Sequence, residues 1–295
     1  PTPGALNGSS EIIGILERVH FSVNHGFFDR PFLLHLSSPE PGSEIRYTLD
    51  GAEPTRLGGA VYTSAIRVAG NTILRAAAFQ DGFLPGEVET RSYLFPEQVL
   101  AQGAQPDGFP GSWGGARADY EMDPEILAVA DVRAEALEGL REIPSISIVL
   151  DVEDMFGSEG IYSNPLRQRP TSPLDQVEKP ASVEFIDPSG RLSGIQVNCG
   201  LRIQGDASRE PDKNPKHSLR LLFKGDYGPS KLEAQLFEDS PVRSLDTLVL
   251  RGEFNNSWTH WSGEQRPRGS NLRDQWGRDS QLAMSGYGSH GNLMH

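Results

Sequence analysis

Residues 195–204, "IQVNCGLRIQ", and residues 216–223, "KHSLRLLF", alternate apolar and polar side chains. A side-chain period of two is typical of a β-strand with one buried face. The predicted core faces consist of Ile195, Val197, Cys199, Leu201 and Ile203 in the first run and Leu219, Leu221 and Phe223 in the second. The pattern therefore predicts two strands, joined by the connection "DASREPDKNP" at residues 206–215.

The faces opposite the predicted core carry polar and basic side chains. They present Arg202, Gln204, Lys216 and Arg220 together. The intervening loop is not a P-loop, because Asp206 and Ala207 stand where that motif needs Lys and Ser or Thr. The G-x-G-x-x-G pattern of protein kinases is also missing from this stretch. An anion-binding hairpin and an ordinary solvated sheet face both remain open on this pattern alone.

A first block, residues 20–95, predicts a small antiparallel β-sandwich. The expected strands are "EIRYTL" (44–49), "TILRAAAF" (72–79) and "EVETRSYLF" (87–95), with turn pairs Asp50-Gly51, Asp81-Gly82 and Pro85-Gly86 between them. Short strands separated by such turns are typical of sandwiches. Asp50 and Glu53 are interpreted as turn and surface residues, because an Asp-Gly pair more often forms a turn than binds a ligand.

The pattern Y-T-x-D-G-x-x-P-T occurs in the segment "IRYTLDGAEPT" (45–55). It is followed by the segment "VYTSAIRVAGNTILRAAAFQDGFLPGEVETRSY" (61–93). They resemble the chitobiase/β-hexosaminidase C-terminal-type sandwich, also described as an Fn3-associated module. That family is an accessory domain of secreted and surface bacterial proteins. The resemblance implies an extracellular or cell-envelope location more than a particular chemistry.

Composition narrows the possible functions. The net charge of −13, from 27 Lys+Arg against 40 Asp+Glu, disfavours nucleic-acid binding, and no apolar run reaches a membrane-spanning length. The lone Cys199 excludes an intrachain disulfide and a Cys-based zinc site, and is expected to be a core residue. The acidic cluster Asp151, Glu153, Asp154 and Glu159 fails the EF-hand pattern, because Phe156 stands at the sixth position, and is interpreted as solvated.

The predicted organisation is a linker at 1–19, the sandwich at 20–95, a connector with a helix at 96–141, and an α+β unit at 142–295. Asp123-Pro124 predicts the start of a helix, with Asp123 as N-cap. Its apolar positions are Ile126, Leu127, Ala130, Ala134, Leu137 and Leu140. Strands are expected at 144–151 and 183–186.

The α+β unit resembles the amino-terminal half of the CotH kinase family. The matching segments include "KPASVEFIDPSG" (179–190), "VNCGLRIQGDASR" (197–209), "NPKHSLRLLFKGDYG" (214–228), "LDTLVLRGEFNNSW" (245–258) and "GSNLRDQWGRDSQLAMSG" (269–286). The resemblance implies a truncated, atypical protein-kinase-like lobe. It also implies binding of ATP with a divalent metal, Mg or Mn, and phosphoryl transfer to Ser of a protein substrate.

Roles follow from that resemblance. Lys216 is the expected phosphate-contacting lysine, with Arg202, Gln204 and Arg220 as its neighbours. Residues 270–284 predict a helix capped by Ser270 that carries Leu272, Trp276, Ala283 and Met284 inward. On this helix Asp274 and Asp279 are candidate partners of Lys216, although both also fit surface acids beside Arg273 and Arg278. Trp258, His260 and Trp261 fit either a cleft wall or core packing.

The chain begins with Pro and stops at "GSHGNLMH". We therefore expect an internal fragment without kinase activity of its own, whose catalytic and metal-binding acids follow His295. The alternative is a non-catalytic module with a degenerate CotH-like scaffold that binds a cell-surface glycan or acts in adhesion. A glycoside-hydrolase role needs a pair of catalytic carboxylates, and no motif here nominates one.

Overall fold

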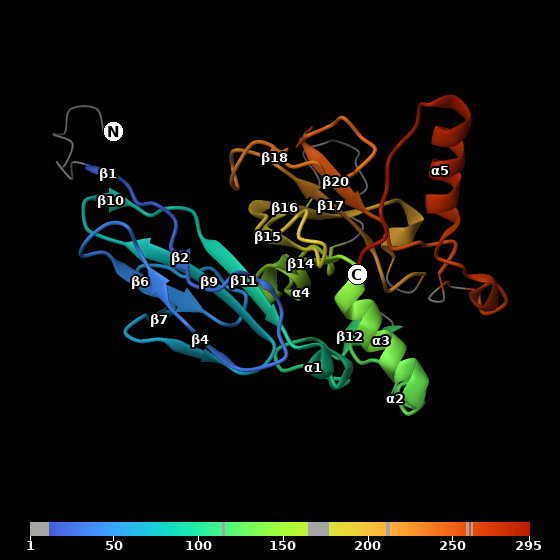
Figure 1. The fold of residues 1–295 in the computed structure, drawn as a ribbon, viewed down its shortest axis with the longest axis horizontal. Helices are drawn as coiled ribbons and strands as arrows, with labels where there is room; N and C mark the ends of the chain where they lie inside the picture. The colour runs from blue at the N-terminus through green and yellow to red at the C-terminus, as the bar shows by residue number, and fades with distance from the viewer. Residues whose placement is uncertain (1–11, 114–115, 165–176, 211–212, 258–259, 261) are drawn as a thin grey trace.

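The computed structural model describes residues 12–113, 116–164, 177–210, 213–257, 260 and 262–295. These residues form two β-sheet units that lie side by side (Figure 1). The amino-terminal unit is a β-sandwich, and the second is built on a five-stranded sheet followed by a helix. The mostly β architecture is consistent with the predicted sandwich.

The main sheet of the sandwich has the strand order β3-β11-β9-β6-β7. Its members are β3 (Gly26–Phe27), β11 (Glu89–Leu94), β9 (Thr72–Phe79), β6 (Glu44–Thr48) and β7 (Ala60–Val61). Short strand pairs complete the sandwich: β1 (Gly14–Ile15) with β10 (Phe83–Leu84), β2 (His20–Phe21) with β5 (Leu36–Ser37), and β4 (Phe32–Leu34) with β8 (Ile66–Val68). The three strands predicted from alternation are all present.

The sandwich core lies between these layers. Leu34, Leu74 and Tyr93 are completely buried in it. The turn after β6 has Gly51 at a φ of +85°, the left-handed conformation that the Asp50-Gly51 pair predicts. Strand β1 and the buried side chains of Leu16 and Val19 also belong to this unit, so the sandwich begins within the stretch predicted to be a linker.

The sheet of the second unit is antiparallel throughout, in the order β14-β15-β16-β17-β20. Its members are β14 (Ser145–Val149), β15 (Lys179–Ile186), β16 (Gln196–Gln204), β17 (Ser218–Leu222) and β20 (Thr247–Leu250). Leu201, Leu221 and Phe223 lie in the core on one face, as alternation predicts. Cys199 is fully buried there, and burial raises the pKa of its thiol to about 12.

Loops and a small strand pair cover that apolar face. Ile161, Leu192 and Leu236 pack into the same core, together with residues of β18 (Leu232–Glu233) and β19 (Ser244–Leu245). The sequence pattern for this unit thus located β14, β15, β16 and β17, but it did not predict β20 or the pair of β18 and β19. The cover of the core consists mainly of irregular chain.

The connector is folded and carries several short elements. They are α1 (Pro96–Leu100), β12 (Ser112–Trp113), β13 (Ala116–Arg117), α2 (Pro124–Leu127) and α3 (Ala130–Glu142), followed after β14 by α4 (Val152–Phe156). Asp123 caps α2 as predicted, because its carboxylate accepts a hydrogen bond from the backbone N–H of Glu125 at 2.9 Å. The single predicted helix is divided into α2 and α3.

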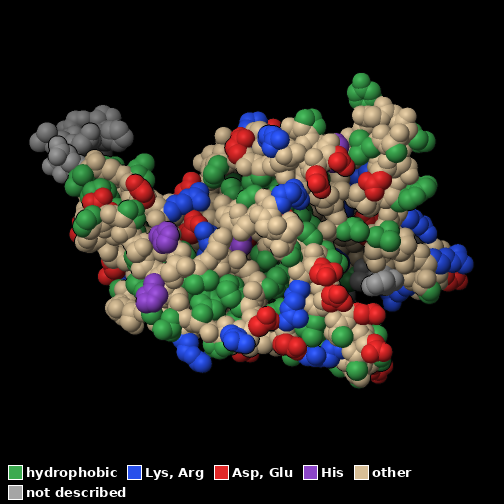
Figure 2. Space-filling view, viewed as in Figure 1, with side chains coloured by type: hydrophobic (Ala, Val, Ile, Leu, Met, Phe, Trp, Pro, Cys, Tyr) green, Lys and Arg blue, Asp and Glu red, His purple; other side chains and the backbone are tan. Residues whose placement is uncertain are grey.

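The last helix, α5 (Arg273–Ser285), differs from its prediction. Its N-cap is Leu272, with no side-chain capping bond, so the expected Ser270 cap is wrong. Leu272, Trp276 and Met284 are 53%, 73% and 83% exposed, so this face does not pack inward. The helix stands beside β20 rather than on the sheet, and apolar side chains lie on the outside of this projection (Figures 1 and 2).

Candidate anion-binding site

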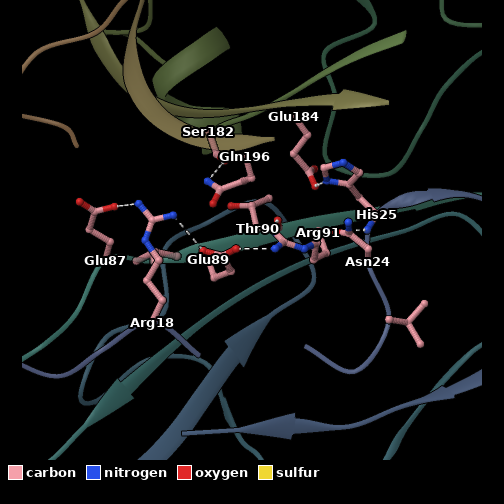
Figure 3. Close-up of polar contacts among 12 residues, drawn as sticks. Arg18, Asn24, His25, Glu87, Glu89, Thr90, Arg91, Ser182, Glu184 and Gln196 are labelled. Atoms are coloured by element: carbon pink, nitrogen blue, oxygen red, sulfur yellow. Dashed lines mark hydrogen bonds and ion pairs between the residues drawn. The ribbon is translucent and has the colours of Figure 1, made fainter. Parts of the chain in front are cut away.

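The face of the β14–β20 sheet opposite its core is divided into two halves. Strand β11 of the sandwich packs on the half near the start of β16, and we call this the junction half. Its centre is Glu184 of β15, which is completely buried. Oε1 of Glu184 lies 2.8 Å from Nδ1 of His25 (Figure 3). The same carboxylate accepts hydrogen bonds from the backbone N–H and hydroxyl of Ser92.

Neutral amides complete the junction half. Nε2 of Gln196 donates to the hydroxyl of Ser182 at 2.7 Å and to Oδ1 of Asn198 at 3.0 Å. Asn198 in turn donates to the carbonyl of Val88 in the sandwich at 3.0 Å. These polar residues of β16 are buried against the neighbouring unit, so a solvated sheet face is the wrong description for them.

The far half of the same face carries the predicted basic residues. Arg202 of β16 and Arg220 of β17 lie directly opposite each other in the strand register. Within the described part of the chain, neither guanidinium makes a hydrogen bond or an ion pair, and Nε of Arg220 is buried without a partner. Burial and the charge of Arg220 lower the pKa of Arg202, whereas Glu178 opposes that shift.

The loop of residues 224–228, which carries Tyr227, lies over Gly200 of β16 and separates the two halves. A Cβ atom at Gly200 would lie 2.6 Å from the ring of Tyr227 and 2.7 Å from Oε1 of Glu178. Glu178 also accepts a hydrogen bond from Nζ of Lys224 at 2.7 Å. The missing side chain at position 200 therefore lets this loop lie against β16.

The remaining predicted residues occupy the end of the hairpin. Gln204 is half-buried and pairs in register with Ser218. Lys216 is exposed in a bend just before β17, and its side chain has no hydrogen bond or ion pair to any described residue. The structure thus brings Arg202 and Arg220 together, and places Lys216 beyond the strand, where strand alternation does not set its direction.

The structure does not pair Asp274 with Lys216. Asp274 forms ion pairs with Arg251, at the end of β20, and with Arg278 one helical turn away. Asp279 accepts a hydrogen bond from Gln275 at 2.8 Å. Because α5 stands beside β20, its acids meet the arginine that follows that strand.

Glu253 belongs to the same cluster and was missed from the sequence. Burial and the nearby charge of Asp274 raise the pKa of Glu253, and its buried Oε2 atom has no hydrogen-bond partner among the described residues. Its backbone has a φ of +53°, a conformation that non-glycine residues rarely adopt. No sequence signal marks a glutamate for this conformation.

The other candidates have structural roles or lie outside the description. His260 is buried and its Nδ1 accepts from the backbone N–H of Ser262, while Trp258 and Trp261 lie outside the described residues. Asp151 caps α4, and Asp154 pairs with Lys179 at 2.9 Å. Within the described ranges, no three His, Cys, Asp or Glu side chains form a group that could hold a metal ion.

Comparison with known families supports the first unit. The family model described as Fn3 associated matches residues 34–93, which confirms the predicted Fn3-associated sandwich in that part of the chain. No curated protein and no solved structure matches the chain. None of the helices among the described residues is long and apolar enough to cross a membrane. The CotH-like character of residues 142–295 stays a prediction from their sequence.

Proposed function

We propose that residues 142–295 form the nucleotide-binding lobe of a CotH-like kinase, with the Fn3-associated sandwich as its accessory module in a secreted or surface bacterial protein. The observation that carries this proposal is the pair of neighbouring cations Arg202 and Arg220, which lack any counter-ion contact among the described residues. A triphosphate offers the charge and the acceptor oxygens that such a pair needs. ATP is the ligand that the CotH resemblance implies.

The cationic residues fit the phosphates of a nucleotide. The orphaned Nε of Arg220 is a donor in need of an acceptor, and Lys216 adds an exposed ammonium at the end of the hairpin. A five-stranded antiparallel sheet followed by a helix supports the kinase-like interpretation by analogy only. The described residues do not fit a metal ion, so the role proposed for them is to bind the phosphates and neutralise their charge.

A calorimetric titration with ATP tests the proposal. The double variant Arg202→Met/Arg220→Met is expected to weaken ATP binding at least about tenfold, or about 1.4 kcal/mol, and to leave any binding of adenosine unchanged. Arg191→Met is the matched control, because Arg191 already donates to the backbone carbonyl of Gln235 at 2.8 Å. Equal ATP affinity in the double variant and the unmodified chain would refute the proposal. In the full-length protein, Lys216→Ala is expected to abolish phosphorylation of protein Ser.

A cavity at the junction of the two units favours a second candidate, glycan binding. It has a volume of about 600 Å³ and is lined by Phe21, Asn24 and Arg91 of the sandwich and by Gly194 of the second unit. Cavities between domains are common small-ligand sites, and aromatic, amide and guanidinium groups suit a sugar. Retention on polysaccharide columns that is lost in Arg91→Ala would support this role, and unchanged elution on every polysaccharide tested would count against it.

A further inference from the structure

The chain around Lys216 combines a free side chain with a firmly held backbone. The ammonium of Lys216 is exposed, yet Asn214, two residues earlier, is only 1% exposed. His217, the next residue, is mostly buried. Exposed loops seldom have buried polar side chains on both sides of one lysine, because each of these must find partners.

Three buried side chains supply hydrogen bonds around this bend. Nδ2 of Asn214 donates to the carbonyl of Lys216 at 2.8 Å. The hydroxyl of Tyr162 donates to the carbonyl of Pro215 at 2.9 Å. Nδ1 of His217 donates to the carbonyl of Ser208 at 2.9 Å, which ties the bend to the opposite side of the loop. Two of these bonds hold carbonyl groups of residues 215 and 216 themselves.

An aromatic layer supports the bend from below. The rings of Tyr162 and His217 lie 4.6 Å apart between centroids, and Tyr162 also contacts Phe156 and Trp113. Burial raises the pKa of Tyr162 and lowers the pKa of His217 to about 4. The layer is therefore uncharged near pH 7, and Lys216 is the one charged side chain in residues 214–218.

We propose that Tyr162, Asn214 and His217 are positioning residues that hold the backbone at Lys216, so that its ammonium is presented in one place to an anionic ligand. The inference rests on the proposed nucleotide-binding function and deepens it by adding the support of the phosphate-contacting lysine. A backbone that is already ordered loses less conformational entropy when the ligand binds. Tyr162 comes from outside the hairpin, and it links the connector aromatics to the site.

Tyr162→Phe is the decisive variant, because it removes only the hydroxyl that bonds Pro215. Tyr120→Phe is its matched control: the hydroxyl of Tyr120 lies in the same aromatic cluster and donates to the carbonyl of Pro110 at 2.9 Å, far along the chain from Lys216. Tyr162→Phe loses one hydrogen bond, and Tyr120→Phe loses two, because the hydroxyl of Tyr120 also accepts from Nε1 of Trp113 at 3.0 Å. Any difference between them at Lys216 therefore reports on position rather than on general stability.

The first measurement is tryptic cleavage after Lys216, quantified by mass spectrometry against cleavage after Lys224. Tyr162→Phe is expected to raise this ratio about fivefold to tenfold, the effect of losing one hydrogen bond on a local opening equilibrium, whereas Tyr120→Phe leaves it unchanged. Asn214→Ala gives a second variant with the same expected direction. Equal ratios in Tyr162→Phe and Tyr120→Phe would overturn the inference.

The second measurement is ATP affinity by calorimetry. Tyr162→Phe is expected to weaken ATP binding about threefold to tenfold, and Tyr120→Phe to leave it unchanged. Unchanged ATP affinity in Tyr162→Phe would also overturn the positioning role. Failure of the proposed function is recognised separately: Lys216→Ala and the double arginine variant would then bind ATP like the unmodified chain, whatever trypsin reports.

Discussion

The junction half and the far half of one sheet face share strand β16, but their polar groups differ in burial and in hydrogen bonding. In the junction half, Gln196 and Asn198 of β16 are buried and hydrogen-bonded, and the carboxyl group of Glu184 is hydrogen-bonded to His25 and Ser92. In the far half, Arg202 and Arg220 lie together without a partner among the described residues. A buried polar group adds to stability only when it is paired, so unpaired cations are the better candidates for binding.

The junction is most sharply tested by Glu184→Ala, which has the largest expected effect. Removing this buried carboxylate leaves the imidazole of His25 and the backbone N–H of Ser92 without their acceptor. We expect the free energy of unfolding to fall by about 3 to 5 kcal/mol. Urea denaturation followed by tryptophan fluorescence measures this change.

Glu87→Ala is the matched control for that experiment. Glu87 forms an ion pair with Arg18 near the same junction, but its side chain is 40% exposed (Figure 3). An exposed pair of this kind contributes less than about 1 kcal/mol. Similar losses in both variants would mean that the junction half does not depend on its buried carboxylate.

His217 is a mostly buried, neutral group at the end of the far half. Its burial predicts that the free energy of unfolding depends on pH. Burial lowers its pKa from 6.5 to about 4, so the unfolded chain binds the proton more tightly than the folded chain does. The free energy of unfolding therefore decreases as the pH falls from 6.5 towards 4, by at most about 3 kcal/mol from this residue. Urea titrations at several pH values within this window measure the slope.

His217→Gln should flatten that slope relative to the unmodified chain. His35 is exposed, and His35→Gln serves as the control that keeps the slope. A slope that survives His217→Gln unchanged would assign the acid sensitivity to other groups, and would remove the claim that the aromatic layer under Lys216 is held neutral by burial.

Local alternation was enough to predict four of the five strands of the second sheet, all but β20, but not what covers their polar faces. Val197, Cys199 and Leu201 are in the core as their spacing predicts. Gln196, Asn198 and Arg202 occupy equivalent alternating positions on the polar face of β16. They differ because β11, a strand about a hundred residues earlier in the chain, packs over Gln196 and Asn198 only. Contacts between distant segments decide burial, and a single strand does not encode them.

The same limit explains the errors at the end of the chain. The spacing of Leu272, Trp276 and Met284 predicted a helix correctly, but not which surface, if any, its apolar side covers. Asp274 was a candidate partner of Lys216 because the CotH resemblance implies a lysine held by an acid from a helix. Its partner is Arg251, since that residue follows β20, the strand beside which α5 stands.

Gly200→Ala tests the boundary between the halves. The added methyl group would press on the ring of Tyr227 and on Glu178, both of which are side chains that can shift. We expect a loss of about 1 to 2 kcal/mol in the free energy of unfolding, together with displacement of the 224–228 loop. Gly225→Ala is less informative, because a Cβ at this position meets nothing within 4 Å. Faster tryptic cleavage after Lys224 in Gly200→Ala would report the displaced loop.

Arg220→Met has the smallest expected effect on stability. The sign of its change in the free energy of unfolding distinguishes the far half from the junction half. It removes one of two like charges that face each other across β16 and β17, and it removes the orphaned Nε donor while keeping an apolar stem of similar length. We expect the free energy of unfolding to rise by about 0.5 kcal/mol at low salt, and this gain to shrink as added salt screens the repulsion.

Arg191→Met should change stability in the opposite direction, because Arg191 donates to the backbone carbonyls of Gln235 and Leu236. Its loss leaves those acceptors without their charged donor and is expected to lower the free energy of unfolding by about 0.5 to 1 kcal/mol. If Arg220→Met also destabilised the chain, Arg220 would be a structural residue like those of the junction half. The far half would then no longer be a candidate anion-binding site, since a cation that stabilises the ligand-free fold already has its partner.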